Sequence, residues 1–181
     1  MTPTFGAHGV YAADLDSDGD VDVLSASADD GQVAWYESDG GDEPAFTAHT
    51  ITTDTVRPLR VIAADLNGDK HLDVVSASRL DGKIAWYANN GSQPPVFTMY
   101  TITTALDHPV SLDSADMDGD GDLDLVSGAS NIPVAWYENG GGSTPTFTTH
   151  EVYTDITGVF AIVAVDVDGD KDVDIVGGSA N

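Results

Sequence analysis

The stretch Asp116-Met117-Asp118-Gly119-Asp120-Gly121-Asp122-Leu123-Asp124 carries five aspartates on alternate positions of a nine-residue window. Carboxylates this close together repel one another and resist desolvation unless a cation lies among them. The alternation offers side-chain oxygens at positions one, three, five and nine, and the backbone carbonyl of position seven can add a further donor. Glycines at positions four and six permit the tight curl that brings these oxygens together. Hard oxygen donors in a flexible loop favour Ca²⁺ over Zn²⁺ or a softer metal.

The same window occurs four times, and its first aspartates are 51, 51 and 50 residues apart. The predicted metal-binding residues are Asp14, Asp16, Asp18, Asp20 and Asp22; Asp65, Asn67, Asp69, His71 and Asp73; Asp116, Asp118, Asp120, Asp122 and Asp124; and Asp166, Asp168, Asp170, Asp172 and Asp174. At position seven, where His71 stands in the second window, the expected ligand is the backbone carbonyl. A single acidic run is usually a solvated surface, but four copies at one period predict about four Ca²⁺ ions per chain.

A helical calcium-binding hand is the main alternative interpretation of these windows. That motif needs a bidentate Glu at position twelve. The residues found there are Ser25, Ser76, Ser127 and Gly177. The sequence on either side of each window is also strand-like, so we expect calcium loops between β-strands.

The repeat extends beyond the aspartates. Ala34-Trp35-Tyr36, Ala85-Trp86-Tyr87 and Ala135-Trp136-Tyr137 recur at 51 and 50 residues, as do Phe46, Phe97 and Phe147. Each repeat is predicted to contain four short strands: one that ends at the metal loop, one that leaves it, one with the tryptophan and one that begins at the phenylalanine. Apolar residues on both faces of the second strand indicate burial on both sides, and no segment keeps a helical period. Four antiparallel strands per repeat predict an all-β fold of β-propeller blades.

We expect complete blades over about residues 8–52, 58–103 and 109–153, followed by a partial blade over residues 158–181. The chain thus supplies about three and a half blades, whereas a propeller needs at least four. Residues 2–7 are one candidate for completing the partial blade, because Pro3-Thr4-Phe5 is similar to Pro145-Thr146-Phe147. The alternatives are a second chain or an open array of repeats. An unpaired strand edge invites another chain, so we expect a homo-oligomer that completes a propeller or forms an array.

The run from Asp116 to Asp124, followed by Val126-Ser127-Gly128 and Ala135-Trp136-Tyr137-Glu138-Asn139-Gly140, resembles the FG-GAP/VCBS repeat. This repeat is the blade unit of integrin α-chain heads and of many secreted or surface bacterial proteins. The resemblance covers nearly the whole chain and implies a propeller with one Ca²⁺ in the loop between the first two strands of each blade. Asn67 replaces an acidic ligand, which implies a weaker second site. The resemblance implies little about function, because the fold is a scaffold with many partners.

The chain has 181 residues, no cysteine and a net charge of −25. Most of this charge lies in the four aspartate loops. The surface stays acidic even with metal bound, which argues against nucleic acid and anionic membrane as partners. No apolar run approaches the ~20 residues of a membrane span, and the N-terminus lacks the basic region and apolar core of a signal peptide. We expect an extracellular or cell-surface protein, and the acidity also fits a halophile.

Enzymatic activity is not expected, because the dense carboxylate pairs lie in repeated loops and catalytic residues are not normally copied into every blade. His49 and His150 share one repeat position and are expected to be structural. The tryptophans either pack between blades or stack on sugars, and their identical Ala-Trp-Tyr context favours packing. We therefore expect a calcium-stabilised module with a structural, self-assembly or adhesion role and a protein or glycan ligand. The alternatives are a carbohydrate-binding propeller and an accessory propeller of a polysaccharide-degrading enzyme.

Overall fold

The computed structural model describes residues 6–130, 133–152 and 158–179. Within these ranges the chain forms strands and no helix, so the predicted all-β fold is confirmed. The strands are β1 (Ala7–Ala13), β2 (Asp22–Ser27), β3 (Gln32–Ser38), β4 (Phe46–Thr52), β5 (Pro58–Ala64), β6 (Asp73–Ser78), β7 (Lys83–Asn89), β8 (Phe97–Thr103), β9 (Pro109–Ala115), β10 (Asp124–Ala129), β11 (Val134–Asn139), β12 (Phe147–Val152), β13 (Val159–Val165) and β14 (Asp174–Ser179). A search of the described residues for a helix that could cross a membrane finds none.

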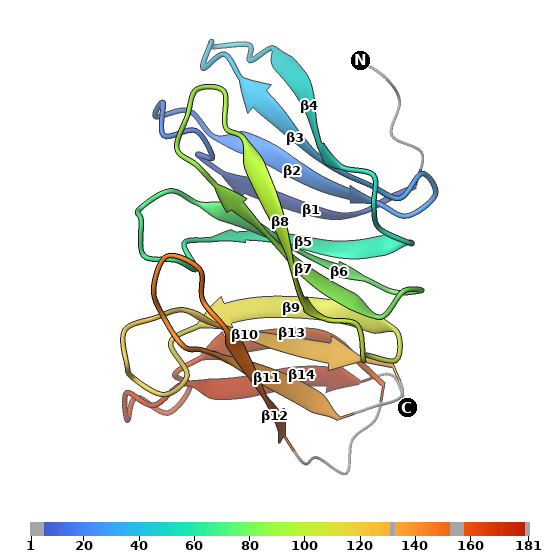
Figure 1. The fold of residues 1–181 in the computed structure, drawn as a ribbon, viewed down its shortest axis with the longest axis vertical. Coiled ribbons are helices and arrows are strands. Elements are labelled where there is room, and N and C mark those ends of the chain that lie inside the picture. The colour runs from blue at the N-terminus through green and yellow to red at the C-terminus, as the bar shows by residue number, and fades with distance from the viewer. Residues whose placement is uncertain (1–5, 131–132, 153–157, 180–181) are drawn as a thin grey trace.

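Consecutive strands pair into antiparallel sheets, each strand beside the next in the chain. The strand orders are β1-β2-β3-β4, β5-β6-β7-β8 and β9-β10-β11-β12, and β13 pairs with β14 in a two-stranded sheet. We call the first three sheets blades one to three and the last one the half-blade. Figure 1 shows blades one to three stacked in chain order from top to bottom, with the half-blade behind blade three. This is the predicted arrangement of repeated four-stranded blades with an incomplete fourth.

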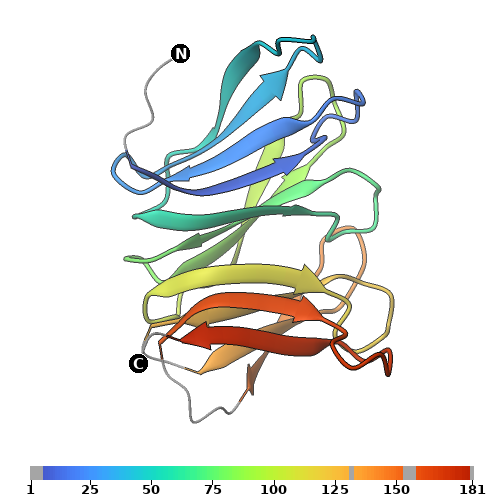
Figure 2. The ribbon, with the colours of Figure 1, turned by 180° about the vertical axis from the view of Figure 1, so that it is seen from behind.

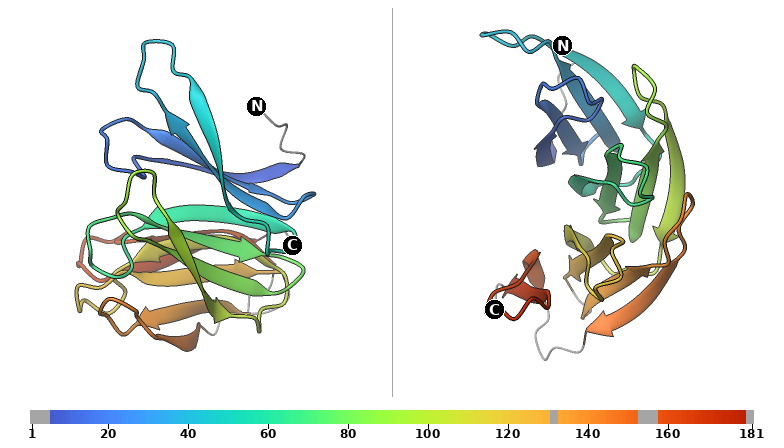
Figure 3. Two further views of the ribbon diagram at one scale, coloured as in Figure 1. Left: turned by 45° about the horizontal axis from the view of Figure 1, so that its top comes forward. Right: turned by 90° about the vertical axis from the view of Figure 1, so that its left-hand side faces the viewer.

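The sheets fan out as an open arc. The first strands, β1, β5, β9 and β13, run side by side on one side of the stack, as Figure 2 shows. The fourth strands, β4, β8 and β12, lie on the convex side, which is clearest in the right-hand view of Figure 3. Each blade therefore runs from the inner to the outer side of the arc in chain order. Blade one and the half-blade form the two ends of the arc.

Apolar cores lie between neighbouring blades. Leu24 of blade one and Tyr87 of blade two belong to the first core. Trp86 of blade two and Leu125 of blade three belong to the second, and Val126 belongs to the third, which includes residues of the half-blade. Strands β6 and β10 are buried along their whole length, and β2 along nearly all of it, as the sequence predicted for second strands. The prediction is wrong for β14, which is largely exposed because the half-blade forms an end of the arc.

The strand ends differ slightly from those expected. In blade two the sequence predicts the third and fourth strands over residues 83–89 and 97–103, and β7 and β8 have these bounds. The sequence predicts its first strand over residues 60–65, whereas β5 covers Pro58–Ala64. The strand stops before Asp65 because that carboxylate accepts hydrogen bonds from the backbone of the loop that follows. The predicted N-terminal strand at Pro3-Thr4-Phe5 lies outside the described residues.

Candidate metal centres

The four aspartate loops join the first and second strands of each blade, so they share one edge of the stack, at the left in Figure 1. The first aspartate of each loop accepts hydrogen bonds from backbone N–H groups three to five residues further on. In the third loop, Asp116 accepts from the N–H groups of Gly119 at 2.8 Å and Gly121 at 3.1 Å. Asp14, Asp65 and Asp166 accept equivalent bonds. Each loop is therefore curled around its first carboxylate.

This curl requires left-handed backbone at positions four and six of every loop. Gly119 and Gly121 take these positions in the third loop, with φ of 78° and 98°. Elsewhere the same conformation is adopted by Ser17, Lys70 and Lys171, with φ of 63°, 73° and 79°. A side chain in this region usually costs about 1–2 kcal/mol. The sequence indicated that the glycines permit this curl, but it gave no sign that Ser17, Lys70 and Lys171 adopt the same conformation.

Carboxylates at positions three and five continue the same pattern. Asp118 accepts from the Asp120 N–H at 3.1 Å, and Asp120 accepts from the Asp122 N–H at 2.9 Å. The first, second and fourth loops repeat both bonds. These bonds use one lone pair of each carboxylate and leave others free for a cation. They fix the side chains before any metal binds.

Three loops bring a trio of carboxylates together. Oxygen atoms within 4.8 Å of one another come from Asp14, Asp16 and Asp18; from Asp116, Asp118 and Asp124; and from Asp166, Asp168 and Asp174. Partial burial and the neighbouring charge of Asp18 raise the pKa of Asp16. These all-oxygen donor sets fit a hard cation such as Ca²⁺.

The second loop differs from the other three. The described carboxylates and histidines of this loop form no such trio, because Asn67 stands where the other loops have aspartate. The Asn67 amide donates to Asp69 at 3.0 Å, a contact that two carboxylates would not make without a proton or a cation. This agrees with a weaker site in blade two, which stays a prediction.

Position nine has a structural role that the sequence did not reveal. Asp73 is 0% exposed, and its carboxylate joins the loop to the third strand. One oxygen accepts from the Leu66 N–H at 3.2 Å, and the other accepts from the Asn89 N–H at 2.8 Å. The buried Asp22 and Asp124 make the same pair of bonds in blades one and three.

Burial raises the pKa of Asp73 to about 6, although the hydrogen bond from the Asn89 N–H lowers it. The Trp86 indole N–H also acts to lower this pKa, but its geometry falls short of a hydrogen bond. Burial raises the pKa of Asp124 in the same way, again against the Asn139 N–H. No cationic side chain of the described residues pairs with either carboxylate. A nearby metal ion would favour their charged forms.

In the first three loops, the side chain at position seven lies against the connection between the third and fourth strands. A Cβ atom placed on Gly91 would collide with the His71 imidazole, and the same holds for Gly40 with Asp20 and Gly141 with Asp122. These glycines lie in the connection between the third and fourth strands, and all have positive φ. The backbone carbonyl therefore remains the expected ligand at this position, as the sequence indicated for His71.

An asparagine at the end of the third strand links the loops of adjacent blades. The Asn89 amide donates to the carbonyl of Leu72 in its own loop at 3.0 Å and to that of Leu15 in the preceding loop at 3.1 Å. Asn139 repeats this arrangement with Leu123 and Leu66. Blade one has Ser38 at the equivalent position. The aspartate loops of adjacent blades are therefore joined through buried hydrogen bonds.

The tryptophans are packed, which confirms the preferred interpretation for two of them. Trp35 and Trp86 are each 1% exposed. Trp35 stacks on His49 with ring centroids 4.4 Å apart, and Trp136, which is partly exposed, stacks on His150 at 4.3 Å. Glu37 pairs with His49 at 2.8 Å and Glu138 with His150 at 2.6 Å. The two histidines thus each cover one face of a tryptophan ring, the structural role predicted for them.

The family model described as FG-GAP-like repeat matches residues 14–76, 65–127 and 116–177. Each match begins at the first aspartate of one loop and extends past the next loop, so the matches overlap and together cover most of the chain. No curated protein matches the sequence.

Proposed function

Because the chain belongs to the FG-GAP-like repeat family, we propose that it is a calcium-binding, non-enzymatic propeller module with a structural, self-assembly or adhesion role. FG-GAP-like repeats are typical of extracellular proteins, and extracellular calcium is abundant, so we propose that it acts outside the cell or at its surface. The observation that carries the proposal is the set of oxygen trios at one edge of the blades.

The proposed ligands in each loop are the side chains at positions one, three, five and nine and the backbone carbonyl at position seven. A bound cation would neutralise carboxylates that otherwise repel one another. It would also stabilise the contact between loop and third strand, because position nine contributes to both. The proposal is thus that metal supports blade geometry, while any protein or glycan partner binds the polar loops around it.

Calorimetric titration of the metal-free protein with Ca²⁺ tests the proposal directly. We expect about four ions per chain and a rise in melting temperature, since a site at 100 times its Kd adds ~2.7 kcal/mol. Asp118→Asn should remove or weaken one site. Asp113→Asn is its control, because Asp113 lies on β9 outside the loop. An absence of calcium binding, with no change in melting temperature on chelation, would contradict the proposal.

We also propose a homo-oligomer, because the end faces of the arc are apolar. Val10 of blade one stands at the repeat position of Val61, yet Val10 is 67% exposed and Val61 is 2% exposed. At the other end, Val167 stands at the position of Leu66, with 63% against 1% exposed. The internal blade contacts suggest what covers these faces: a half-blade of one copy against blade one of another. Such a head-to-tail contact closes into a ring or continues as a filament.

Carbohydrate binding remains the second candidate, although the burial of Trp35 and Trp86 disfavours sugar stacking on these two tryptophans. A pocket of about 260 Å³ lies beside Trp86, lined also by Tyr100 and Phe147. Tyr100 is 38% exposed and offers the aromatic surface there. A glycan array at saturating Ca²⁺ distinguishes the two functions, because sugar binding that Tyr100→Ala removes would favour the lectin. An accessory role beside a polysaccharide-degrading enzyme would require a catalytic domain outside these repeats.

A further inference from the structure

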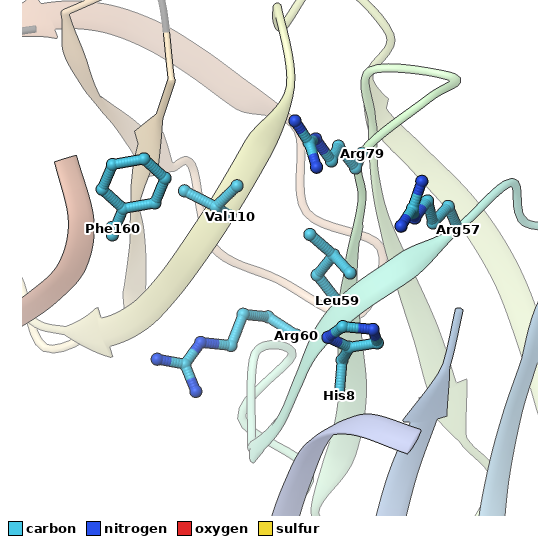
Figure 4. A pocket seen from close by; sticks show the side chains of 7 residues that line it. All are labelled: His8, Arg57, Leu59, Arg60, Arg79, Val110 and Phe160. Carbon is cyan, nitrogen blue, oxygen red and sulfur yellow. The ribbon is translucent and has the colours of Figure 1, made fainter. Parts of the chain in front are cut away.

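A pocket of about 390 Å³ lies near the starts of the first strands, at the edge opposite to the aspartate loops. Four of its lining residues occupy one repeat position, the second residue of each first strand: His8, Leu59, Val110 and Phe160. The other lining residues are Arg57, Arg60 and Arg79. Figure 4 shows Leu59 near the centre, with His8 and the arginines around it and with Val110 and Phe160 to one side.

The arginines of this pocket are all the arginines of the chain. Together with three lysines they are the six cationic Lys and Arg residues of a protein with a net charge of −25. All three arginines belong to blade two. Blade one has small residues at the corresponding positions, namely Gly6, Gly9 and Ala28. Since blade one forms the same sheet without them, the arginines are not needed to build a blade.

The guanidinium groups lack anionic partners among the described residues. No ion pair joins Arg57, Arg60 or Arg79 to a described carboxylate. The Nε atom of Arg79 is buried and has no hydrogen-bond partner there. Like charges that line one pocket repel one another, and an anion bound among them would reduce this repulsion. Guanidinium groups bind carboxylate and phosphate with paired hydrogen bonds.

The left-handed backbone at Arg57 belongs to the repeat. Arg57 has a φ of 61°, a conformation that glycine adopts most easily. Gly6, His108 and Gly158 take the same repeat position, with φ of 75°, 59° and 76°. Blade two thus has a long cationic side chain where blade one and the half-blade have glycine.

We propose that this pocket binds a small organic anion, with its carboxylate or phosphate group on the arginines and its apolar body against Leu59, Val110 and Phe160. The volume lies within the range of small-molecule sites. Phe160 is 49% exposed and provides an aromatic wall. This site is separate from the calcium loops and does not depend on the proposed calcium function.

Titration calorimetry at saturating Ca²⁺ tests the proposal with five probes: benzoate, phenyl phosphate, benzyl alcohol, acetate and inorganic phosphate. Benzoate or phenyl phosphate should bind, and the comparison between them identifies the preferred oxyanion. Benzyl alcohol, which lacks the charge, should not bind. Acetate and inorganic phosphate should bind at least about tenfold more weakly than their aromatic counterparts, since they lack the apolar body. If neither aromatic anion binds, or if the bare anions bind equally well, the proposal is wrong.

Substitutions separate binding from folding. Arg79→Met should weaken binding of the preferred probe by about tenfold or more, because a charge-assisted hydrogen bond is lost. Arg57→Gly should also weaken binding while leaving the melting temperature unchanged or higher, because glycine relieves the left-handed strain. Lys70→Gln is the charge-matched control, since Lys70 lies in an aspartate loop at the opposite edge. This variant should bind the preferred probe as the wild-type protein does. Binding that survives both arginine substitutions, or that Lys70→Gln weakens equally, would overturn the proposal.

Discussion

Two buried tyrosines make the fold sensitive to alkaline pH. Burial raises the pKa of Tyr87 and of Tyr137 to about 12, although the hydroxyl groups of Ser76 and Ser127 lower it. A raised pKa in the folded state means that the neutral phenol is favoured by folding. Each tyrosine therefore contributes fully below pH ~10, and its contribution of about 2–3 kcal/mol is lost as the pH rises towards 12.

Absorbance of the phenolate during a pH titration measures this effect. Of the six tyrosines, we expect Tyr87 and Tyr137 to ionise late and together with unfolding. Tyr87→Phe removes one of these phenols. Its free energy of unfolding should therefore fall less between neutral and alkaline pH than that of the wild-type protein. Ionisation of all six near pH ~10 with the sheet signal intact would show that this reasoning is wrong.

Loop curvature also depends on single residues. Gly121 has a φ of 98°, and a Cβ atom placed there would meet no other atom within 4 Å. Gly121→Ala therefore tests backbone strain without a steric clash, and we expect a loss of about 1–2 kcal/mol in urea unfolding. Gly178→Ala is the control, because Gly178 has no positive φ and its nearest neighbour, Ala161 Cβ, is 3.8 Å away. Equal effects of the two substitutions would contradict this explanation.

At the scale of the strands and loops, Asn89 joins two aspartate loops. Its amide donates to the carbonyls of Leu15 and Leu72, and its side-chain oxygen accepts from the Gly91 N–H at 2.9 Å. Asn89→Ala leaves these buried groups without partners, and each lost bond costs about 1 kcal/mol. We expect a total loss of about 2–3 kcal/mol in chemical unfolding.

Asn89→Ser is the informative companion, because Ser38 takes this position in blade one. Serine can keep the local bond to Gly91 but cannot reach the preceding loop, so its effect should be intermediate. In calcium titrations, both variants should also show a lower calcium affinity at the first loop, since Leu15 lies within it. Normal calcium binding by the first loop in Asn89→Ala would show that the bridge does not couple the loops.

Much of the strand and loop structure could be predicted, because the same residue pattern recurs in each repeat. The aspartate spacing gave the loops, and the double-sided apolar pattern gave the buried second strands such as β6. The Asn89 bridge could not be predicted, since it joins residues 74 apart and depends on how blades stack. The structural role of Asp73 could not be predicted either. In a sequence, an aspartate that would bind metal looks the same as one that accepts buried hydrogen bonds. The arginine pocket combines residues from four sheets, and only their three-dimensional arrangement brings them together.

At the scale of the whole molecule, the apolar end faces predict association. We expect light scattering to show an oligomer at micromolar concentration in the presence of Ca²⁺. Val167→Glu places a charge on one end face and should give a monomer with a nearly unchanged melting transition. Val10→Glu should do the same from the other face.

Leu80→Glu is the matched control, because Leu80 is 56% exposed in the turn between β6 and β7, away from both end faces. This variant should remain oligomeric. A wild-type protein that stays monomeric at micromolar concentration would contradict the head-to-tail contact. An oligomer that Leu80→Glu dissociates as readily as Val167→Glu would place the interface elsewhere.

The Asn89 bridge has a consequence for how such a chain changes over generations. Because Asn139 repeats the bridge with Leu66 that Asn89 makes with Leu15, the contact is defined by repeat position and not by particular neighbours. Recombination within the aspartate loops, from Asp65 directly to Met117, would remove 51 residues and restore a complete loop. Asn139 would then face the carbonyl of Leu15. The aspartate loops are thus natural crossover points at which descendants can gain or lose whole blades.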